Sequence, residues 1–403
     1  MGPATFHPRR ALVVVLGDLG RSPRMTHHAI ALAEAGFSVT LAGYCETPLP
    51  ERALANPRIE VRELRSLPAA PRDAGVAAFL WRTFRRVALL HWSLAGLLWT
   101  CCPRGGTVLA QNPPSLPTLW LCACVARLRG ARFVADWHNF GFSLLALRLG
   151  RSFAVRWAER YEMWAGGLAD GAFCVSEAMR RDLRRRGLRG PLEVVYDRPL
   201  SIAPALSEEA RRALLRRILP DALPADAVLV CPTSWTADEN IELLLEALKL
   251  RDCDEAAPRL LVLLTGQGPL RPTYEARIAA LPLKRAAVQT HFLSPADYRG
   301  LLRAADLGLS LHSSSSGIDL PMKIVDFFGA GTPVLALDYG PCLAELVQDG
   351  VQGRTFRDAA GLARLLDEAV RPPQVARFRE SLAQNGPLWA EEASGGWRRL
   401  GFA

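Results

Sequence analysis

The chain has 403 residues, of which 50% are hydrophobic and 22% charged, which excludes a disordered or fibrous protein and allows two domains. Lysine and arginine outnumber aspartate and glutamate by 49 to 40, and this excess indicates an anionic partner such as phosphate, a membrane or nucleic acid. The nine cysteines have no metal-type spacing and several lie in apolar runs, so we expect reduced thiols on the cytosolic side. No secretory signal is expected before the first strand.

The first predicted strand, Leu12–Leu16, is followed by the loop GDLGRSPRM, a helix and the strand SVTLAG. This order is a βαβ unit, which predicts a doubly wound parallel sheet. The loop lacks the G-x-G-x-x-G spacing of a dinucleotide site. Arg21 and Arg24 lie where the loop enters the helix, and we expect them beside an anionic ligand. The alternative is that both are solvated residues of the first helical turn.

A tryptophan-rich segment between Val76 and Cys102 predicts a long helix. Its uncharged part is shorter than the roughly 20 residues needed to span a bilayer. Tryptophan and arginine together suit the headgroup zone, so an interfacial membrane helix and a buried core helix are the two alternatives. One helical stripe, spaced at steps of three or four, contains Trp81, Phe84, Ala88, Trp92, Ala95 and Trp99.

Polar residues follow two further predicted strands, Thr107–Gln111 and Ala131–Asp136. The carboxyl ends of parallel strands face the ligand crevice of such a sheet, so we expect His138 to point into a cleft. The alternative is a histidine with a purely structural role.

A change in composition at Tyr196–Pro199 predicts a boundary between domains. The N-terminal domain is expected to cover 1–195, a linker 196–226, and a second Rossmann-like domain 227–374, where strands and helices again alternate. The helical tail 375–403 is expected to pack back across the domains. Loops at predicted strand ends of the second domain carry Ser234, Trp235, Gly266 and Gly268.

The segment His312–Val334 combines a serine loop with a predicted helix and the next strand. Asp319 and Pro321 are a plausible N-cap and first-turn residue for this helix, which carries Lys323 and Asp326 on one face. A helix N-terminus behind a donor-rich loop suits phosphate, and a carboxylate one turn further suits ribose hydroxyls. The alternative is an ordinary loop, helix and strand with a solvated aspartate.

Seven blocks of the chain, in this order, resemble the chitobiosyldiphosphodolichol β-mannosyltransferase family: GDLGRSPRM, QNPP, DWHNFGFS, VYDRP, TSWTADE, TGQGPL and SSSGIDLPMKIVDFFGAGTPV. The resemblance implies an α/β GT-B fold, in which two Rossmann-like, doubly wound parallel-sheet domains face each other across a cleft. It implies inverting transfer of mannose from GDP-mannose to GlcNAc2-diphosphodolichol, forming a β1,4 link on the cytosolic face of the endoplasmic reticulum.

The partners that the resemblance implies are GDP-mannose, dolichyl-diphosphate-GlcNAc2 and a membrane surface. Other mannosyltransferases of the dolichol pathway are candidate partners, and no nucleic acid is expected. Family members often carry an N-terminal transmembrane anchor, whereas this chain is expected to attach through the Trp81–Trp99 helix and its basic surface. Ser234 and Glu239 stand where the wider superfamily commonly places an arginine and a lysine on the diphosphate.

The resemblance also suggests how the candidate site residues divide between the two substrates. Donor-side candidates are Lys323 for the diphosphate and Asp326 for the ribose, together with Asp319, Ser315, Ser316, Gly317, Ser234, Trp235, Gly266 and Gly268. Candidates for the acceptor and its diphosphate are Gly20, Arg21, Arg24 and Asn139.

Inversion requires a base for the acceptor hydroxyl, and His138 is the first candidate, with Asp18 second, because both follow strands of the acceptor-side domain. No protein-bound metal or cofactor is expected, although free Mg²⁺ can assist. A nicotinamide-dependent oxidoreductase is an alternative, opposed by the missing glycine motif. Another GT-B transferase and a catalytically inactive sugar-nucleotide-binding subunit are further alternatives.

Overall fold

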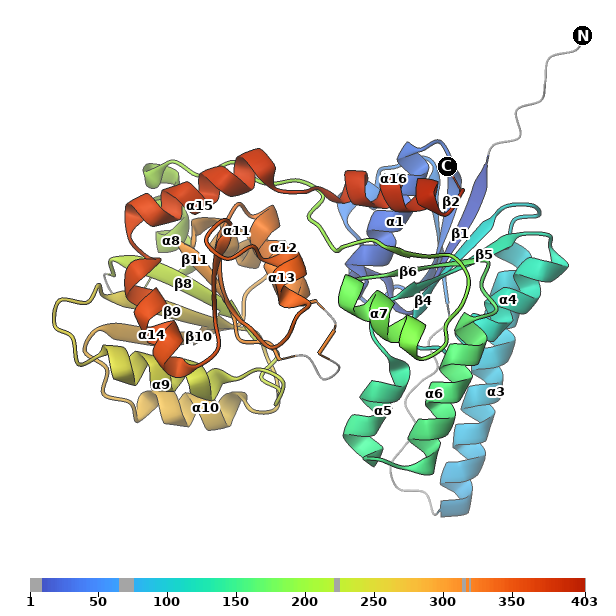
Figure 1. Cartoon of the computed structure of the whole chain (residues 1–403), viewed down its shortest axis with the longest axis horizontal. Coiled ribbons are helices and arrows are strands. Elements are labelled where there is room, and N and C mark those ends of the chain that lie inside the picture. The colour runs from blue at the N-terminus through green and yellow to red at the C-terminus, as the bar shows by residue number, and fades with distance from the viewer. Residues whose placement is uncertain (1–8, 65–75, 221–224, 314–316, 319, 403) are drawn as a thin grey trace, which may run out of the picture. The chain divides into compact units, whose positions relative to one another are not determined.

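The computed structural model describes residues 9–64, 76–220, 225–313, 317–318 and 320–402, with the backbone alone for 76–87 and 148. The chain forms two compact units (Figure 1). The first contains the described residues up to Val195 together with those from Ala390 onward, and the second runs from Tyr196 to Trp389. Each unit is built on one parallel sheet, which confirms the prediction of two doubly wound α/β domains.

The sheet of the first unit has seven strands in the order β3-β2-β1-β4-β5-β6-β7. All neighbouring strands in it are parallel. Its inner strand β1 has the buried, β-branched run expected where helices cover both faces of a sheet. The strands are β1 (Arg10–Asp18), β2 (Ser38–Tyr44), β3 (Ile59–Glu63), β4 (Thr107–Asn112), β5 (Arg132–Trp137), β6 (Gly171–Cys174) and β7 (Leu192–Val194).

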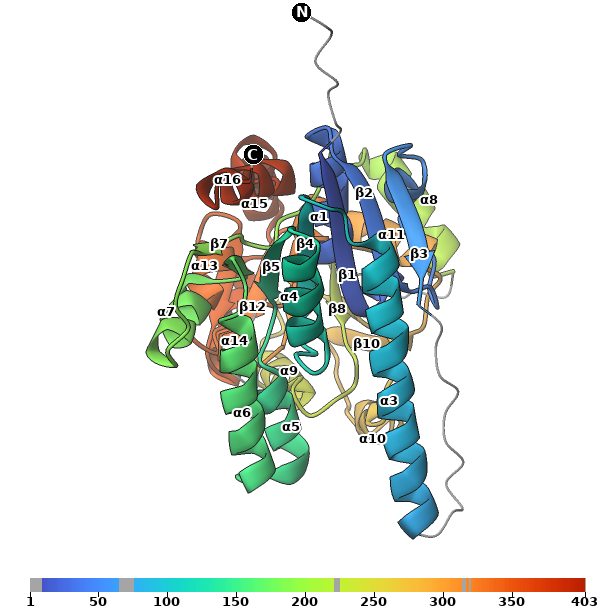
Figure 2. The same cartoon turned by 90° about the vertical axis from the view of Figure 1, so that its right-hand side faces the viewer.

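The helices of the first unit cover this sheet, and three of them, α3, α5 and α6, project beyond it in one direction (Figures 1 and 2). Serine side chains cap two helices, since Ser152 accepts from Val155 N at 3.4 Å and Ser176 from Met179 N at 3.0 Å. The helices are α1 (Pro23–Glu34), α2 (Glu51–Leu54), α3 (Val76–Cys101), α4 (Thr118–Leu128), α5 (Gly141–Leu149), α6 (Phe153–Gly166), α7 (Glu177–Arg185) and α16 (Trp389–Arg399).

The long helix α3 exposes its tryptophans where its side chains are described. Trp92 and Trp99 are exposed, while Leu94 and Leu98 are fully buried, so the predicted stripe faces outward in this part. The side chains of Trp81 and Phe84 lie outside the described residues. Among the described residues, no helix is long and apolar enough to cross a membrane.

The sheet of the second unit has six strands in the order β10-β9-β8-β11-β12-β13. The strands are β8 (Ala227–Pro232), β9 (Leu260–Thr265), β10 (Ala286–His291), β11 (Leu307–Ser310), β12 (Val334–Leu337) and β13 (Gly353–Phe356). The helices are α8 (Glu208–Ile218), α9 (Ile241–Arg251), α10 (Arg271–Ala279), α11 (Pro295–Ala304), α12 (Met322–Gly329), α13 (Leu343–Leu346), α14 (Ala359–Glu368) and α15 (Pro372–Asn385).

The structure differs from the expected segmentation at two places. The segment 196–226, expected as a linker, contains α8, which belongs to the second unit and packs on α11. Arg211 of α8 also binds Asp306 Oδ2 through Nη2 at 2.6 Å. The tail 375–403 divides, because α15 belongs to the second unit while Trp397 of α16 packs edge-on against Phe173 in the first.

The predicted helix behind the serine loop is α12, and the strand expected after it is β12. The residue at the N-cap position is Pro321, which has no side-chain cap to offer. Asp319, the expected cap, lies outside the described residues, as do Ser315 and Ser316.

Candidate active site

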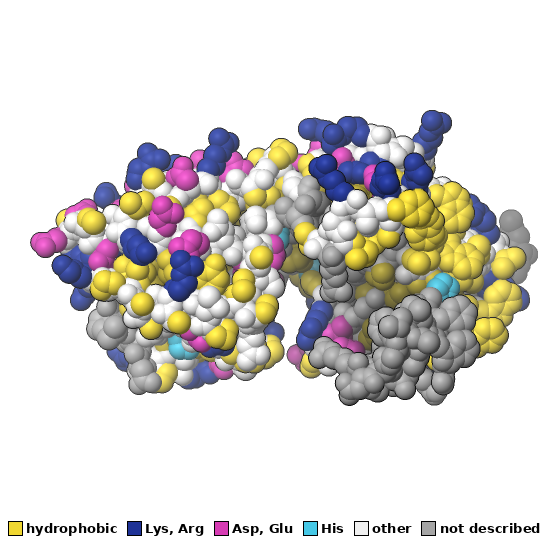
Figure 3. Space-filling view, turned by 90° about the horizontal axis from the view of Figure 1, so that it is seen from below, with side chains coloured by type: hydrophobic (Ala, Val, Ile, Leu, Met, Phe, Trp, Pro, Cys, Tyr) yellow, Lys and Arg dark blue, Asp and Glu magenta, His cyan; other side chains and the backbone are white. Residues whose placement is uncertain are grey.

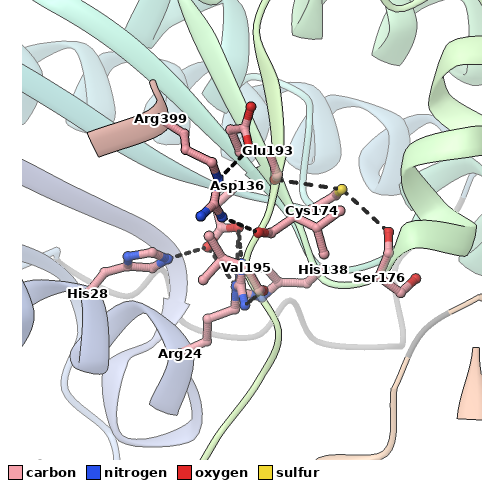
Figure 4. A network of polar contacts seen from close by, with 10 residues as sticks. Arg24, His28, Asp136, His138, Cys174, Ser176, Glu193, Val195 and Arg399 are labelled. Atoms are coloured by element: carbon pink, nitrogen blue, oxygen red, sulfur yellow. Dashed lines mark hydrogen bonds and ion pairs between the residues drawn. The ribbon is translucent and has the colours of Figure 1, made fainter. Parts of the chain in front are cut away.

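A buried carboxylate at the end of β5 is the centre of a polar network in the first unit (Figure 4). The side chain of Asp136 is fully buried. Arg24 of α1 donates from Nε to both carboxylate oxygens, at 3.1 and 2.9 Å, and from Nη2 to Oδ1 at 2.9 Å. The remaining amino group, Nη1, donates to the carbonyl of Val195 at 2.6 Å. This bidentate geometry fixes the orientation of the carboxylate.

Two histidines lie against the same oxygen of Asp136. His138 Nε2 lies 3.0 Å from Oδ2, and His28 Nε2 lies 3.3 Å from it. His28 is fully buried, with its ring stacked on Phe173 and edge-on to Trp397. His138 keeps 21% of its side chain exposed, so it alone of the two can meet a substrate.

The charges of this network follow from burial and pairing. Burial raises the pKa of Asp136, but the charge of Arg24 and the contact with His138 outweigh it and hold that pKa well below its usual value. Burial lowers the pKa of His28, and this effect is larger than the opposite effect of the Asp136 charge, which raises that pKa. Asp136 is therefore ionised, and with Nε2 of His138 donating to it, Nδ1 carries the lone pair that can accept a proton.

Glu162 of α6 holds the backbone around His138. Its buried carboxylate accepts from Asn112 Nδ2 at 2.7 Å and from the amides of Gly141 and Phe142 at 3.0 and 3.1 Å. Burial raises its pKa, although these hydrogen bonds oppose the shift. Because His138 N also donates to the Asn112 carbonyl at 2.8 Å, the ends of β4 and β5 and the start of α5 form one rigid edge.

Asp18, the second candidate base, lies at the end of β1 but serves a loop. Its Oδ1 accepts from the amides of Glu46 and Thr47, both at 3.1 Å, and its Oδ2 accepts from the Thr47 hydroxyl. Burial raises the pKa of Asp18, but the hydrogen bonds together have the larger effect, so the pKa lies below its usual value. An acid that is easily ionised and already saturated with donors is a weaker base than His138. Gly20 is needed for the same loop, since a Cβ there would lie 2.2 Å from Thr47 Oγ1.

The two arginines expected at the diphosphate have different environments. Arg21 is 77% exposed, with Nε 3.6 Å from Asp18 Oδ2. Arg24 is only 3% exposed and is paired with Asp136, so its geometry is that of a structural clamp and not of the expected anion contact. The Asn139 side chain accepts from Phe140 N at 2.7 Å.

In the second unit, the loops after β8 and β11 meet at the carboxyl edge of the sheet, where the strand order reverses. Glu239 pairs with His312 in an isolated bridge, and Ser313 N donates to the Asp238 carbonyl at 2.7 Å. Lys323 of α12 forms an ion pair with the buried carboxylate of Glu239. Burial lowers the pKa of Lys323. An ammonium has three donor hydrogens, so this pairing leaves Lys323 able to bind a second acceptor.

Three expected donor contacts have a structural role here. Trp235 is fully buried at φ 51°, and its indole donates to the Gly266 carbonyl at 3.1 Å. A Cβ at Gly266 would lie 2.1 Å from Thr233 O, and one at Gly268 would lie 1.8 Å from Ser234 O. The glycines therefore let the loop after β9 approach the loop after β8, and Trp235 anchors both. This differs from the expected contact between Trp235 and the donor.

Two further donor-side candidates, Ser234 and Asp326, are accessible. Ser234 is exposed, and its amide donates to Glu239 Oε2 at 3.2 Å. Asp326 keeps part of its surface exposed on α12 and has no hydrogen-bond donor among the described side chains, and burial raises the pKa of its carboxyl to about 6. Gly317 adopts φ 73°, which favours glycine. Among the described residues, no group of three or more His, Cys, Asp or Glu side chains could hold a metal ion.

Sequence reasoning did not select Asp136, His28 or Glu162 as site residues. Asp136 could have been predicted as a site residue, because it ends a predicted parallel strand two residues before His138. Glu162 and His28 lie on helices far from that strand in sequence, and no local pattern connects them to it. Glu239 was noted for its place in the loop, but its pairing with Lys323 was not expected.

Comparisons with known proteins agree with the fold. Residues 20–198 match the family described as glycosyl transferase 4-like domain, and residues 226–371 match glycosyl transferases group 1. HepE of Anabaena, solved with UDP-glucose, superposes with a TM-score of 0.68 at 16% identity, covering 98% of this chain and 100% of that one. Sucrose-phosphate synthase of Thermosynechococcus elongatus superposes with a TM-score of 0.64 at 18% identity, covering 98% and 96%. The protein is thus a glycosyltransferase of the GT-B class.

Sequence relatives define the family within this class. The chitobiosyldiphosphodolichol beta-mannosyltransferase of Yarrowia lipolytica is 40% identical over 86% of this chain and 75% of its own length. The human protein of the same name is 36% identical over 95% of this chain and 90% of its own. The UDP-glycosyltransferase TURAN of Arabidopsis thaliana is 38% identical over 88% and 87%. The chain belongs to the chitobiosyldiphosphodolichol beta-mannosyltransferase family, and the expected family membership is confirmed.

Proposed function

We propose that this enzyme transfers mannose from GDP-mannose to GlcNAc2-diphosphodolichol with inversion, forming a β1,4 link. The names of the relatives support the acceptor, and the family supports the enzyme class. The observation that carries the chemistry is the partly exposed His138 held by the ionised Asp136 at the carboxyl edge of β5. A single displacement with inversion needs one base on the acceptor side, and this pair supplies it.

In the proposed reaction, His138 Nδ1 accepts the proton of the acceptor hydroxyl as its oxygen bonds to the anomeric carbon of mannose. The bond from that carbon to the diphosphate breaks on the opposite face, and its electron pair leaves with GDP. Asp136 stabilises the imidazolium that forms, and Arg24 keeps Asp136 ionised and oriented. Arg24 is therefore a positioning residue in this proposal.

The donor is proposed to bind at the carboxyl edge of the second sheet. Lys323 would donate to the diphosphate as negative charge develops there, and Asp326 would accept hydrogen bonds from the ribose. Ser234, Gly317, Ser315, Ser316 and Asp319 remain predicted donor contacts, and of these Ser234 is exposed among the described residues. Free Mg²⁺ can assist the leaving diphosphate without a site in the protein.

The proposed location is the cytosolic face of the endoplasmic reticulum, with the enzyme bound at the membrane surface. A lipid-linked acceptor requires the first unit to work beside a bilayer. The net charge of +9 and the exposed Trp92 and Trp99 of α3 support this association. Other mannosyltransferases of the same pathway remain candidate partners.

Donor-dependent release of nucleotide tests the proposal. Purified enzyme is given GlcNAc2-diphosphodolichol with GDP-mannose or, because one relative is named a UDP-glycosyltransferase, with UDP-glucose. We expect GDP release only with GDP-mannose and acceptor together, and a product that β-mannosidase cleaves. Turnover with UDP-glucose alone would overturn the donor assignment. Binding of GDP-mannose without any release would favour an inactive sugar-nucleotide-binding subunit.

A further inference from the structure

Helix α6 buries one face against the first unit and exposes the other. Val155 and Ala165 lie on the inner face, where Gly166 also packs so closely on Trp137 that a Cβ would lie 2.4 Å from its ring. The opposite face carries aromatic residues at steps of four, four and three, so they align on one side of the helix. This aromatic stripe consists of Phe153, Trp157, Tyr161 and Trp164.

Three of the four rings of the aromatic stripe are exposed to solvent, and the fourth, Tyr161, is half-buried. Phe153, Trp157 and Trp164 are 72%, 50% and 57% exposed. The Trp157 and Tyr161 rings stack at 5.5 Å, and Tyr161 and Trp164 lie 5.7 Å apart. A folded protein rarely leaves such a stripe in water, so it indicates a binding surface.

The exposed apolar surface continues onto neighbouring helices. Leu144, Leu147 and Leu149 are exposed on α5, the helix that packs against α6. Helices α3, α5 and α6 project from the sheet in the same direction (Figures 1 and 2), and hydrophobic side chains gather on that face of the first unit (Figure 3). The exposed apolar side chains of α5 and α6 therefore lie on helices that project in one direction from the sheet.

Charge indicates what binds there. Arg151 precedes α6, and Arg156 and Arg160 lie on it one turn from the aromatic residues; all three are exposed. The one acidic side chain on the outer part of α6, Glu159, is paired with Arg186. Aromatic rings with flanking arginines suit the headgroup zone of an anionic bilayer, where the rings enter the interface and the guanidiniums meet phosphates.

The same helix reaches the candidate active site from its inner face. Glu162 follows Tyr161 directly and binds Asn112 and the start of α5 beside His138. Contact of the aromatic stripe with a bilayer would thus bring the acceptor-side edge close to a lipid-linked substrate.

We propose that the aromatic stripe of α6, with the tip of α5, docks the first unit on an anionic bilayer surface. This inference names the membrane-binding element and rests on the proposed function only for the reason why docking is useful. Membrane attachment was expected from the sequence only through α3, so α6 is an additional membrane-binding element.

The test measures binding of the full chain to vesicles of phosphatidylcholine and phosphatidylserine in about a 7:3 ratio by flotation. Phe153→Glu combined with Trp157→Glu should lower the partition coefficient roughly 10-fold or more, because charges replace inserted rings. Phe292→Glu is the matched control, since Phe292 is 65% exposed in the second unit and should leave binding unchanged. Transfer to a water-soluble acceptor analogue should be the same in all three proteins.

A second measurement locates the inserted residues without disturbing the fold. Brominated phosphatidylcholine should quench part of the tryptophan fluorescence of the wild type, and Trp157→Phe with Trp164→Phe should remove much of that quenching while flotation persists. Unchanged flotation of the glutamate variant would overturn the proposal. So would a wild-type dimer that the glutamate variant dissociates without any change in vesicle binding, because the stripe would then be an interface between copies. If the wild type floats normally yet transfers no mannose in detergent, the proposed function fails and the docking surface stands.

Discussion

In the first unit the acid at the strand edge is buried and paired, whereas in the second unit the acid of α12 has no partner among the described side chains and burial raises its pKa to about 6. Asp136 binds Arg24 and lies against two histidines, while Asp326 has no described side chain donating to it. The first arrangement holds one partly exposed imidazole in a fixed direction. The second leaves polar groups ready for a ligand that must arrive and depart. This contrast suggests that the base is preorganised by the protein and that the donor site is completed by the donor.

The sharpest test of the contrast removes the base. His138→Ala should lower kcat by about 100- to 10,000-fold while GDP binding stays nearly unchanged, because the imidazole acts only on the acceptor. Steady-state transfer and GDP affinity measured on one preparation check this. His138→Gln should be almost as slow, since an amide hydrogen-bonds without useful basicity. A fast Gln variant would show that His138 is a binding residue, and Asp18→Asn would then be expected to abolish transfer.

Removal of the cation in the second unit should have the next largest effect. Lys323→Ala should lower transfer roughly 100-fold, since a positioned donor to the developing diphosphate charge is lost. Single-turnover rates with saturating GDP-mannose measure this. Glu239→Gln is the informative comparison, because it releases Lys323 from its ion pair but keeps the ammonium. If the two variants lose activity equally, the ion pair itself, and not the diphosphate contact, is what matters.

A smaller effect is expected when the carboxylate of Asp326 is removed. Asp326→Ala should raise the KM for GDP-mannose by roughly 10-fold with little change in kcat, because a ribose contact is made equally in the ground and transition states. The melting temperature at pH 7 should not fall, because burial raises the pKa of Asp326 to about 6 and its charged form therefore gains no stability from the fold. A lower kcat at unchanged KM would place Asp326 at the chemistry and weaken the contrast.

The smallest effect concerns the pH dependence of stability in the two units. Burial lowers the pKa of His28 below 6.5, so unfolding of the first unit takes up a proton below pH 6.5. Its free energy of unfolding should therefore fall, by up to about 1.4 kcal/mol per pH unit, as pH drops from 6.5 to the folded-state pKa.

The stability of the second unit is expected to change with pH in the opposite direction. Burial raises the pKa of Asp306 above 3.8, so the contribution of that group is greatest in acid and is lost as pH rises through its folded-state value. Hydrogen exchange of β5 and β9 amides at pH 7 and pH 5 compares the units. We expect β5 to lose more protection, and equal losses would contradict this assignment. His28→Asn should flatten the slope for the first unit.

Much of the fold follows from local sequence. Buried apolar runs such as Leu12–Val15 and Leu260–Leu264, separated by helical patterns, predict two parallel sheets, and both are present. The α12 helix and the strand after it were also predicted. Helix α8 was missed within the expected linker, although Ser207, which caps it, is a recognisable start signal.

The polar site was only partly predictable from the sequence. That His138 lies at a strand end is a local property, and the prediction required only the order of strands and loops. That Arg24 clamps Asp136 across 112 positions, and that Trp235 is buried instead of exposed in its loop, depends on contacts between distant segments. No spacing along the chain encodes those contacts.

The sequence by itself thus determined the family, the two sheets and the strand ends at which polar groups gather, because hydrophobic periodicity and turn residues act locally. Only the tertiary structure decided which arginine is a clamp, which histidine is exposed, and where the tail divides between the units. It also decided which face of α6 turns outward. Packing of Gly166 on Trp137 and the hydrogen bonds of Glu162 select the inner face, so Phe153, Trp157 and Trp164 remain exposed.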